Sequence, residues 1–198
     1  MTRIQKIHTK PTFLKFLSGI FRKLAPGWVL RFIGIASEIK LNITGVIGAN
    51  GEMPYIDGGG SGRANSGDGM LYINTGELII DKITLENGFK DEQNGGAVIE
   101  ISGGKVIVMN SIVKNSFDDS GNGGGALFIA GGTLEIINTT LKNNEAGNGG
   151  DGGALYVKGG NVFIAQSKFL RNFAIRGGGV AMEGGLLKIK SSILSSNK

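Results

Sequence analysis

A glycine-led pattern occurs four times between Gly95 and Asn197, and it constrains the fold more than any other feature of the chain. The copies start 29, 28 and 25 residues apart. Each copy begins with two glycines followed by a small and an apolar residue: Gly95-Gly96-Ala97-Val98, Gly124-Gly125-Ala126-Leu127, Gly152-Gly153-Ala154-Leu155 and Gly177-Gly178-Gly179-Val180. A period of this size predicts stacked repeats, because so short a unit cannot bury its own apolar face.

Each copy continues with a second glycine pair and closes on a large apolar residue three places before an asparagine. The closing pairs are Ile112 with Asn115, Leu141 with Asn144, Phe169 with Asn172, and Leu194 with Asn197. Asparagine amides bond well to corner backbone and to one another along a stack. We therefore expect an inward ladder made of Asn87, Asn115, Asn144, Asn172 and Asn197.

The runs between the glycines are short and rich in valine and isoleucine, and several alternate apolar with polar residues. They span residues 97–101, 105–109, 127–130, 133–137, 155–158 and 161–165. This is strand spacing with one buried face, and no copy has room for a ten-residue helix. The pattern predicts an all-β fold in which residues 31–198 form a single-stranded parallel β-helix, with a right-handed sense expected. Strands of successive turns would pair about 4.8 Å apart.

The two repeated motifs resemble those of the chlamydial polymorphic outer membrane proteins, in which Gly-Gly-Ala precedes Ile, Leu or Val and Phe-x-x-Asn follows. Only Phe169-Leu170-Arg171-Asn172 meets the second motif strictly. The resemblance implies an autotransporter passenger at the cell surface or outer membrane, or secreted, that adheres to a protein or glycan of a host cell. The motif residues it implies for binding are Gly124, Gly125, Ala126, Leu127, Gly152, Gly153, Ala154, Leu155, Phe169 and Asn172.

Residues 1–30 form a separate basic segment. Residues 1–37 hold seven Lys or Arg and no Asp or Glu, so the net charge of +5 belongs to this end. Apolar residues between Phe13 and Leu24 recur at helical spacing, which predicts an amphipathic helix. Three roles remain open: a cap on the solenoid, a membrane-surface or targeting segment, and a cleaved secretory signal. The repeats lack a basic stripe, so no nucleic-acid partner is expected.

The alternatives to a binding protein are an enzyme and a structural spacer. The chain has no cysteine and one histidine, His8, which argues against thiol chemistry, a zinc site or any cofactor. A polysaccharide-degrading β-helix, of lyase or hydrolase type, would need acids and bases gathered on one outer face. The candidate bases are Lys105, Lys168, Arg171 and Lys188, and the candidate acids are Glu100, Glu135 and Glu183. The acids occupy different phases of the repeat, so we expect no enzyme.

Two corners are longer than the others, residues 115–123 and 143–151. We expect them to project from adjacent turns as a binding surface, with Asp118-Asp119 in a solvated loop. We also expect the solenoid end near Lys198 to expose apolar core and strand edges. The rest of a longer chain or a second copy would then cover that end.

Overall fold

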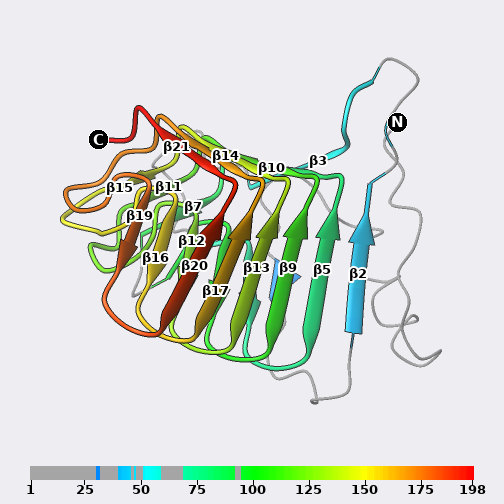
Figure 1. The fold of residues 1–198 in the computed structure, drawn as a ribbon, viewed down its shortest axis with the longest axis horizontal. Coiled ribbons are helices and arrows are strands. Elements are labelled where there is room, and N and C mark those ends of the chain that lie inside the picture. Colours follow the sequence, from blue (N-terminus) through cyan, green and yellow to red (C-terminus); the bar gives the residue numbers. More distant parts are fainter. Residues whose placement is uncertain (1–29, 32–39, 46, 48–50, 59–68, 92–94) are drawn as a thin grey trace.

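The computed structural model describes residues 30–31, 40–45, 47, 51–58, 69–91 and 95–198, and within these residues it contains strands and no helix. The strands form a parallel β-solenoid of about five turns, seen from the side in Figure 1. The all-β parallel solenoid predicted from the repeats is therefore confirmed. The amphipathic helix predicted within residues 1–30 lies outside the described residues, except that Leu30 begins the first strand.

Three six-stranded sheets make up the walls, and within each sheet neighbouring strands come from successive turns. Sheet I contains β1 (Leu30–Arg31), β4 (Leu71–Ile73), β8 (Ile99–Ile101), β12 (Leu127–Ile129), β16 (Leu155–Val157) and β19 (Val180–Met182). Sheet II contains β2 (Lys40–Thr44), β5 (Glu77–Asp81), β9 (Lys105–Met109), β13 (Thr133–Ile137), β17 (Asn161–Ala165) and β20 (Leu186–Lys190). Sheet III contains β3 (Tyr55–Asp57), β6 (Thr84–Glu86), β10 (Ile112–Lys114), β14 (Thr140–Lys142), β18 (Lys168–Leu170) and β21 (Ile193–Ser195).

A short fourth sheet, sheet IV, follows sheet III in three successive turns. It contains β7 (Phe89–Lys90), β11 (Phe117–Asp118) and β15 (Glu145–Ala146). Lys90 on β7 forms an ion pair with Glu100 on β8, with 2.7 Å between Nζ and Oε2. Glu100 lies between the inward residues Ile99 and Ile101, so its side chain points outward from sheet I. Sheet IV therefore lies against the outward side of sheet I.

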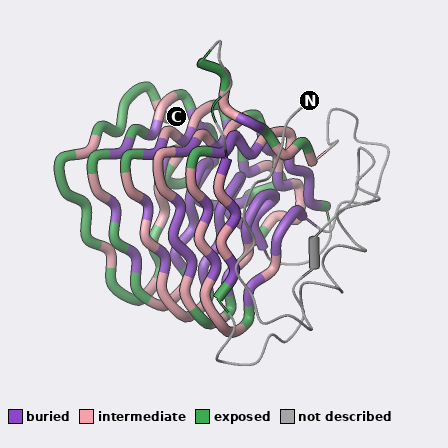
Figure 2. Tube along the Cα trace, turned by 90° about the vertical axis from the view of Figure 1, so that its right-hand side faces the viewer, coloured by how far each residue is buried: buried purple, intermediate pink, exposed green. Residues whose placement is uncertain are grey.

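The core is formed by every second side chain of the strands, which points inward. In β13, Leu134 and Ile136 are fully buried while Thr133, Glu135 and Ile137 are only partly buried. The neighbouring strands β9 and β17 pair with β13 residue for residue, so inward side chains stack from turn to turn. Figure 2 shows buried stretches along the turns and exposed positions at their corners.

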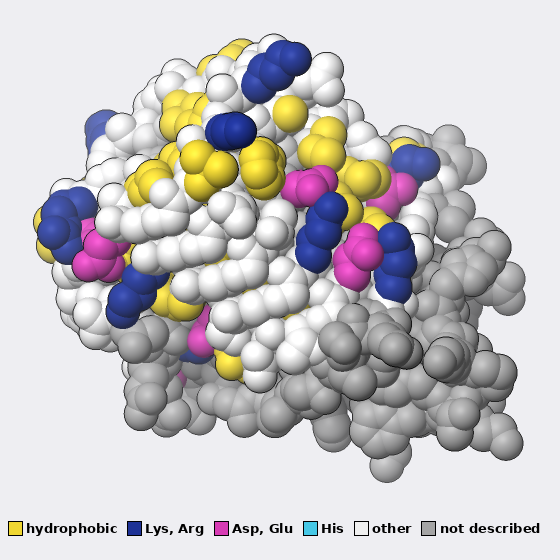
Figure 3. Space-filling view, turned by 60° about the horizontal axis from the view of Figure 1, so that its bottom comes forward, with side chains coloured by type: hydrophobic (Ala, Val, Ile, Leu, Met, Phe, Trp, Pro, Cys, Tyr) yellow, Lys and Arg dark blue, Asp and Glu magenta, His cyan; other side chains and the backbone are white. Residues whose placement is uncertain are grey.

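The corner between sheets I and II is built from stacked glycines. Gly104, Gly132, Gly160 and Gly185 all have φ between 70° and 86°, a region that glycine enters without steric cost. A Cβ on Gly132 would also lie 2.5 Å from the carbonyl oxygen of Gly104 in the preceding turn. The corner runs along the lower edge of Figure 1 and comes forward in Figure 3 as rows largely without coloured side chains. Glycine is thus required here by both conformation and packing.

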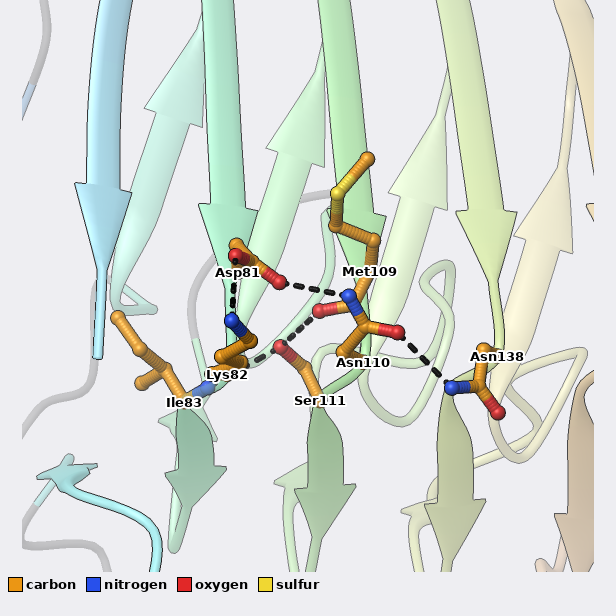
Figure 4. A network of polar contacts seen from close by, with 7 residues as sticks. All are labelled: Asp81, Lys82, Ile83, Met109, Asn110, Ser111 and Asn138. Atoms are coloured by element: carbon orange, nitrogen blue, oxygen red, sulfur yellow. Dashed lines mark hydrogen bonds and ion pairs between the residues drawn. The ribbon is translucent and has the colours of Figure 1, made fainter. Parts of the chain in front are cut away.

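The corner between sheets II and III carries two polar ladders, one outside and one inside (Figure 4). Outside, Asn138 Nδ2 donates to Asn110 Oδ1 and Asn110 Nδ2 donates to Asp81 Oδ1, both at 2.8 Å. Inside, the Ile83 amide donates to Ser111 Oγ at 3.2 Å, and Ser111 Oγ donates to the Met109 carbonyl. The inner bonds satisfy backbone groups that the bend would otherwise leave unpaired, whereas the outer bonds join side chains of successive turns.

The outward face of sheet II carries a band of apolar side chains that crosses Figure 3. Two ion pairs border the band: Lys40 with Glu77 at 3.1 Å and Lys105 with Glu135 at 2.7 Å. Each joins strands of adjacent turns. Partly exposed pairs of this kind add little stability.

Candidate functional site

The motif residues implied for binding lie inside the solenoid wall. Ala126, Leu127, Ala154, Leu155 and Phe169 are fully buried, and Asn172 is almost so. The glycines at 124, 125, 152 and 153 are also buried. A Cβ on Gly125 would lie 2.1 Å from the carbonyl oxygen of Gly153. Side chains in such positions pack against one another and space the turns.

The asparagine ladder has three members among the five expected. Asn144 Nδ2 donates to Asn172 Oδ1 at 3.0 Å, and Asn172 Nδ2 donates to Asn197 Oδ1 at 2.9 Å. Asn87 and Asn115 instead lie one position earlier in the turn, with φ of 55° and 56°. Their side chains form hydrogen bonds outside the core. Asn87 Nδ2 donates to Asp57 Oδ1, and Asn115 Oδ1 accepts from Asn143 Nδ2. In Asn115's turn the ladder position belongs to Ser116, whose amide donates to Asn144 Oδ1 at 3.1 Å.

The corners that lead back to sheet I stack into a continuous surface, which we call the corner ridge (residues 119–123, 147–151 and 173–177). Direct bonds join successive corners: the Gly147 amide donates to the Asp118 carbonyl at 2.7 Å, and Asn148 Nδ2 donates to the Asp119 carbonyl at 3.0 Å. The next pair of corners is joined by the Gly152 amide, which donates to the Arg176 carbonyl at 2.9 Å. The two long corners predicted to project from adjacent turns thus lie side by side and are held together.

The third corner exposes two large apolar side chains and an arginine. Phe173 is 49% exposed and Ile175 is 73% exposed, while Ala174 between them is buried. Arg176 is held by a bidentate pair with Asp151, from Nε to Oδ1 at 2.7 Å and from Nη2 to Oδ2 at 2.6 Å. This pairing raises the pKa of Arg176 above its ordinary value. The guanidinium is therefore fixed in place while its side chain remains largely exposed.

A buried polar cluster lies under the ridge, where sheet IV faces sheet I. Lys90 is buried and paired with Glu100, and the adjacent turn places Asp118 in register with Lys90. Asp118 Oδ1 accepts from the Ser120 amide at 2.8 Å. Asp118 Oδ2 and Ser120 Oγ are buried with no hydrogen-bond partner among the described residues. Asp118 was expected in a solvated loop, and the structure corrects this, because its strand pairs on both sides.

Burial dominates the electrostatics of Asp118. It raises the pKa of this carboxyl from 3.8 to about 6, against the lowering effect of the Ser120 bond and the Lys90 charge; Glu100 adds a smaller raising effect. Desolvation disfavours the charged form of an acid. Nearby, burial and then the bond to Glu183 raise the pKa of Tyr156 to about 12, and its hydroxyl donates to Glu183 Oε2 at 2.6 Å. The Tyr156 ring packs at a tilt against Phe128.

We expect Asp118 to make the protein less stable as the pH rises from 4 to 7. An acid whose folded pKa lies above its unfolded value binds more protons when folded, so the free energy of unfolding falls as pH rises through the window between 3.8 and about 6. The contribution is at most about 3 kcal/mol. Urea unfolding of the protein and of Asp118→Asn at pH 4 and pH 7 measures this contribution. It is the part of the pH dependence of the unfolding free energy that the substitution removes.

Asp119→Asn is the matched control, because this neighbour is only partly buried. It should leave the pH dependence of stability unchanged within about 0.5 kcal/mol, as expected for a surface substitution. Equal pH dependence in the protein and in Asp118→Asn would contradict a neutral Asp118 below pH 6.

The candidate catalytic residues do not converge on one face. Lys105, Glu135 and Lys188 lie on outward positions of sheet II, whereas Lys168 lies on sheet III. Glu100 and Glu183 lie on the sheet I side and are bonded to Lys90 and Tyr156, and Arg171 occupies a corner with φ of 54°. Lys105 bonds Glu135, which raises the pKa of the lysine. A general base needs a pKa lowered towards neutrality, so the pairing works against that role.

Comparison with known proteins found no matching family model, no matching curated protein and no matching solved structure. Within the described part of the chain, no three His, Asp or Glu side chains gather closely enough to hold a metal ion. No helix in that same part is long and apolar enough to cross a membrane.

Sequence reasoning did not find Phe173, Ile175 and Arg176 as candidate contact residues, nor the cluster around Asp118. Phe173, Ile175 and Arg176 lie on the shortest corner, whose length did not mark it as a binding surface. Strands β7, β11 and β15 have two residues each, which is too short for alternation to be recognised.

Proposed function

We propose that this chain is a non-catalytic β-helix displayed at a cell surface, where it binds a protein or glycan of another cell. The observation that carries this proposal is the corner ridge, where Phe173 and Ile175 are exposed beside an arginine fixed by Asp151. Aromatic side chains and arginine are enriched among the residues that dominate binding energy. Fixing the guanidinium before binding lowers the entropy that the complex must lose.

The rest of the turn supports this role by making the ridge rigid. Successive corners are bonded to one another, and the walls beneath them are parallel sheets with fully buried side chains. Contacts on several turns then act together, so weak contacts on each turn sum to a useful affinity. We further propose that the solenoid is right-handed, the usual sense of parallel crossovers, and that it is a passenger of the polymorphic outer membrane protein type.

A polysaccharide-degrading enzyme and a passive spacer are the competing functions. The enzyme is less well supported because its candidate acids and bases are dispersed over different faces and mostly paired. The spacer would need only the buried repeat and would not depend on the side chains of the ridge. The experiment below separates binding from both.

The test compares attachment of coated beads to cultured animal cells. One set of beads carries the full chain, and a second carries the double variant Phe173→Ser/Ile175→Ser. We expect the variant to lose most attachment, at least about tenfold, because two hot-spot side chains together contribute more than 1.4 kcal/mol. Circular dichroism of both proteins verifies that the fold is kept.

Ile47→Ser/Tyr55→Ser is the matched control, since these two apolar side chains are also exposed but lie in the first turn. It should attach as well as the original chain. Equal loss in both double variants would indicate nonspecific hydrophobic adhesion, and no attachment by the folded original chain would contradict the binding role. Reducing or unsaturated ends released from a polysaccharide panel would favour the enzyme.

A further inference from the structure

We propose that a cluster of unpaired basic side chains around the corner between sheets II and III binds an anionic polysaccharide. We call it the basic cluster, and it consists of Lys142, Lys168, Arg171, Lys188 and Lys190. The choice of a polysaccharide rests on the proposed function at a cell surface. The basic cluster itself uses none of the residues of the corner ridge, so each surface can be tested without the other.

The charge of the repeats is divided unevenly along the chain. Residues 38–151 hold 15 Asp or Glu and seven Lys or Arg, whereas residues 152–198 hold one Glu and seven Lys or Arg. That single acid, Glu183, already accepts a hydrogen bond from the Tyr156 hydroxyl. Residues 152–198 therefore carry a strong positive charge, although the repeats taken together are slightly acidic.

The strand register gathers these cations on two walls that meet at one corner. Lys168 is exposed on the outward side of β18, and Lys142 lies on the adjacent strand β14, whose Thr140 pairs with Lys168. Adjacent strands are about 4.8 Å apart. Arg171 is exposed immediately after β18. Lys188 and Lys190 are exposed on β20, and the chain then turns into β21, which pairs with β18.

The basic cluster differs from the lysines of earlier turns in having no acidic partners. Lys40, Lys82 and Lys105 each lie within 4 Å of a carboxylate oxygen, at 3.1, 3.9 and 2.7 Å. No member of the basic cluster forms an ion pair within the part of the chain that the structure describes. Neighbouring cations that are not compensated repel one another, and they attract ligands of the opposite charge.

The arrangement suits an extended polyanion. The basic cluster spans strands of three successive turns and continues around a corner, so a chain with repeated sulfate or carboxylate groups can contact several members at once. The aromatic residue beside it is Phe163, and Lys188 Nζ lies 5.7 Å from its ring centroid. Single-stranded nucleic acids are bound by stacking bases on aromatic rings. Because Lys188 lies over this ring, we favour an anionic polysaccharide.

The test measures binding of the full chain to immobilised polysaccharides at about 0.15 M salt, where charges more than about 8 Å apart are largely screened. The probes are dextran sulfate, hyaluronan and uncharged dextran. Residues 1–37 hold seven Lys or Arg and no acid, so these seven are replaced by glutamine in every protein compared. We expect binding to dextran sulfate, weaker binding to the less densely charged hyaluronan, and none to dextran.

The decisive comparison is between two triple variants. Lys168→Gln/Lys188→Gln/Lys190→Gln should bind dextran sulfate at least about tenfold more weakly, since a basic residue near an anionic surface strengthens binding about fivefold. Lys40→Gln/Lys82→Gln/Lys105→Gln removes the same charge from lysines that have acidic partners, and it should bind within about twofold of the parent chain. Circular dichroism of each variant verifies the fold.

The remaining outcomes separate this proposal from its alternatives. Equal affinities of the two triple variants, or no binding by their parent chain, would overturn it. Tighter binding to a single-stranded oligonucleotide or to phosphatidylserine vesicles would overturn it in favour of a nucleic acid or a membrane surface. Phe173→Ser/Ile175→Ser should keep its affinity for dextran sulfate, so a failure of the corner ridge and a failure of the basic cluster appear in different measurements.

Discussion

Phe169→Ala is expected to destabilise the protein by about 3–5 kcal/mol, the usual cost of removing a fully buried phenylalanine. The Phe169 side chain has no exposed surface and stacks in register between Leu141 and Leu194. The substitution would leave a cavity between two turns that cannot collapse, because the flanking strands are bonded at a fixed spacing. Urea unfolding monitored by circular dichroism measures the loss.

Phe163→Ala is the matched control, only six residues away in the same turn. This phenylalanine points outward from sheet II, is exposed, and has Lys188 Nζ 5.7 Å from its ring centroid. Its loss should cost about 1 kcal/mol or less, as expected for an exposed cation–π contact. Similar losses for both variants would mean that burial does not distinguish inward from outward positions in this turn.

Asn172→Ala is expected to cost about 2–4 kcal/mol, because it leaves several buried groups without partners. Asn172 Oδ1 accepts from both the amide and the Nδ2 of Asn144, and its own Nδ2 donates to the Leu141 carbonyl and to Asn197 Oδ1. All but the last of these bonds are buried. The free energy of unfolding in urea measures the effect.

Asn161→Ala provides the comparison, since this asparagine lies outward on β17, is exposed, and its side chain makes no hydrogen bond within the described residues. Its replacement should change stability by less than about 0.5 kcal/mol. A loss of that size for Asn172→Ala as well would show that the ladder does not stabilise the solenoid.

The fold could be predicted because glycine pairs and strand alternation recur together. The run predicted at residues 105–109 is the strand Lys105–Met109, and that at 133–137 is Thr133–Ile137. Both signals act locally: glycine marks the corner, and the alternation marks which side is buried. Stacking then follows from the repeat, because each turn has an apolar face and the next turn has a matching one.

The alignment of the first copy was wrong by one residue. Ile112 and Asn115 have the same spacing as Phe169 and Asn172, but the inward residues equivalent to that pair are Val113 and Ser116. Asparagine is suited both to the buried ladder and to the adjacent corner with positive φ. When a turn has a single asparagine, the sequence alone does not say whether that residue occupies the buried ladder position or the corner position before it. Burial decides it, since Val113 is fully buried and Ile112 is not.

The candidate site was predicted less well than the fold. The two long corners were located from their length, but the exposed apolar residues occur on the short corner at 173–177. Asp118 was expected in a solvated loop because it lies within the long corner at residues 115–123. Its burial depends on sheet IV lying against the outward side of sheet I, a contact between strands of only two or three residues. Such a contact leaves no periodic pattern in the sequence.

The glycine corner between sheets I and II affects how a protein of this kind diverges in evolution. A Cβ at Gly104, Gly132, Gly160 or Gly185 would meet the carbonyl oxygen of the glycine one turn before it, so a point substitution there damages two turns at once. An insertion in the corner ridge damages neither, and the starts of successive copies are already separated by 29, 28 and 25 residues. Descendants of this chain should therefore gain or lose whole turns by duplication and deletion. Their ridges should change rapidly while the glycine column stays fixed.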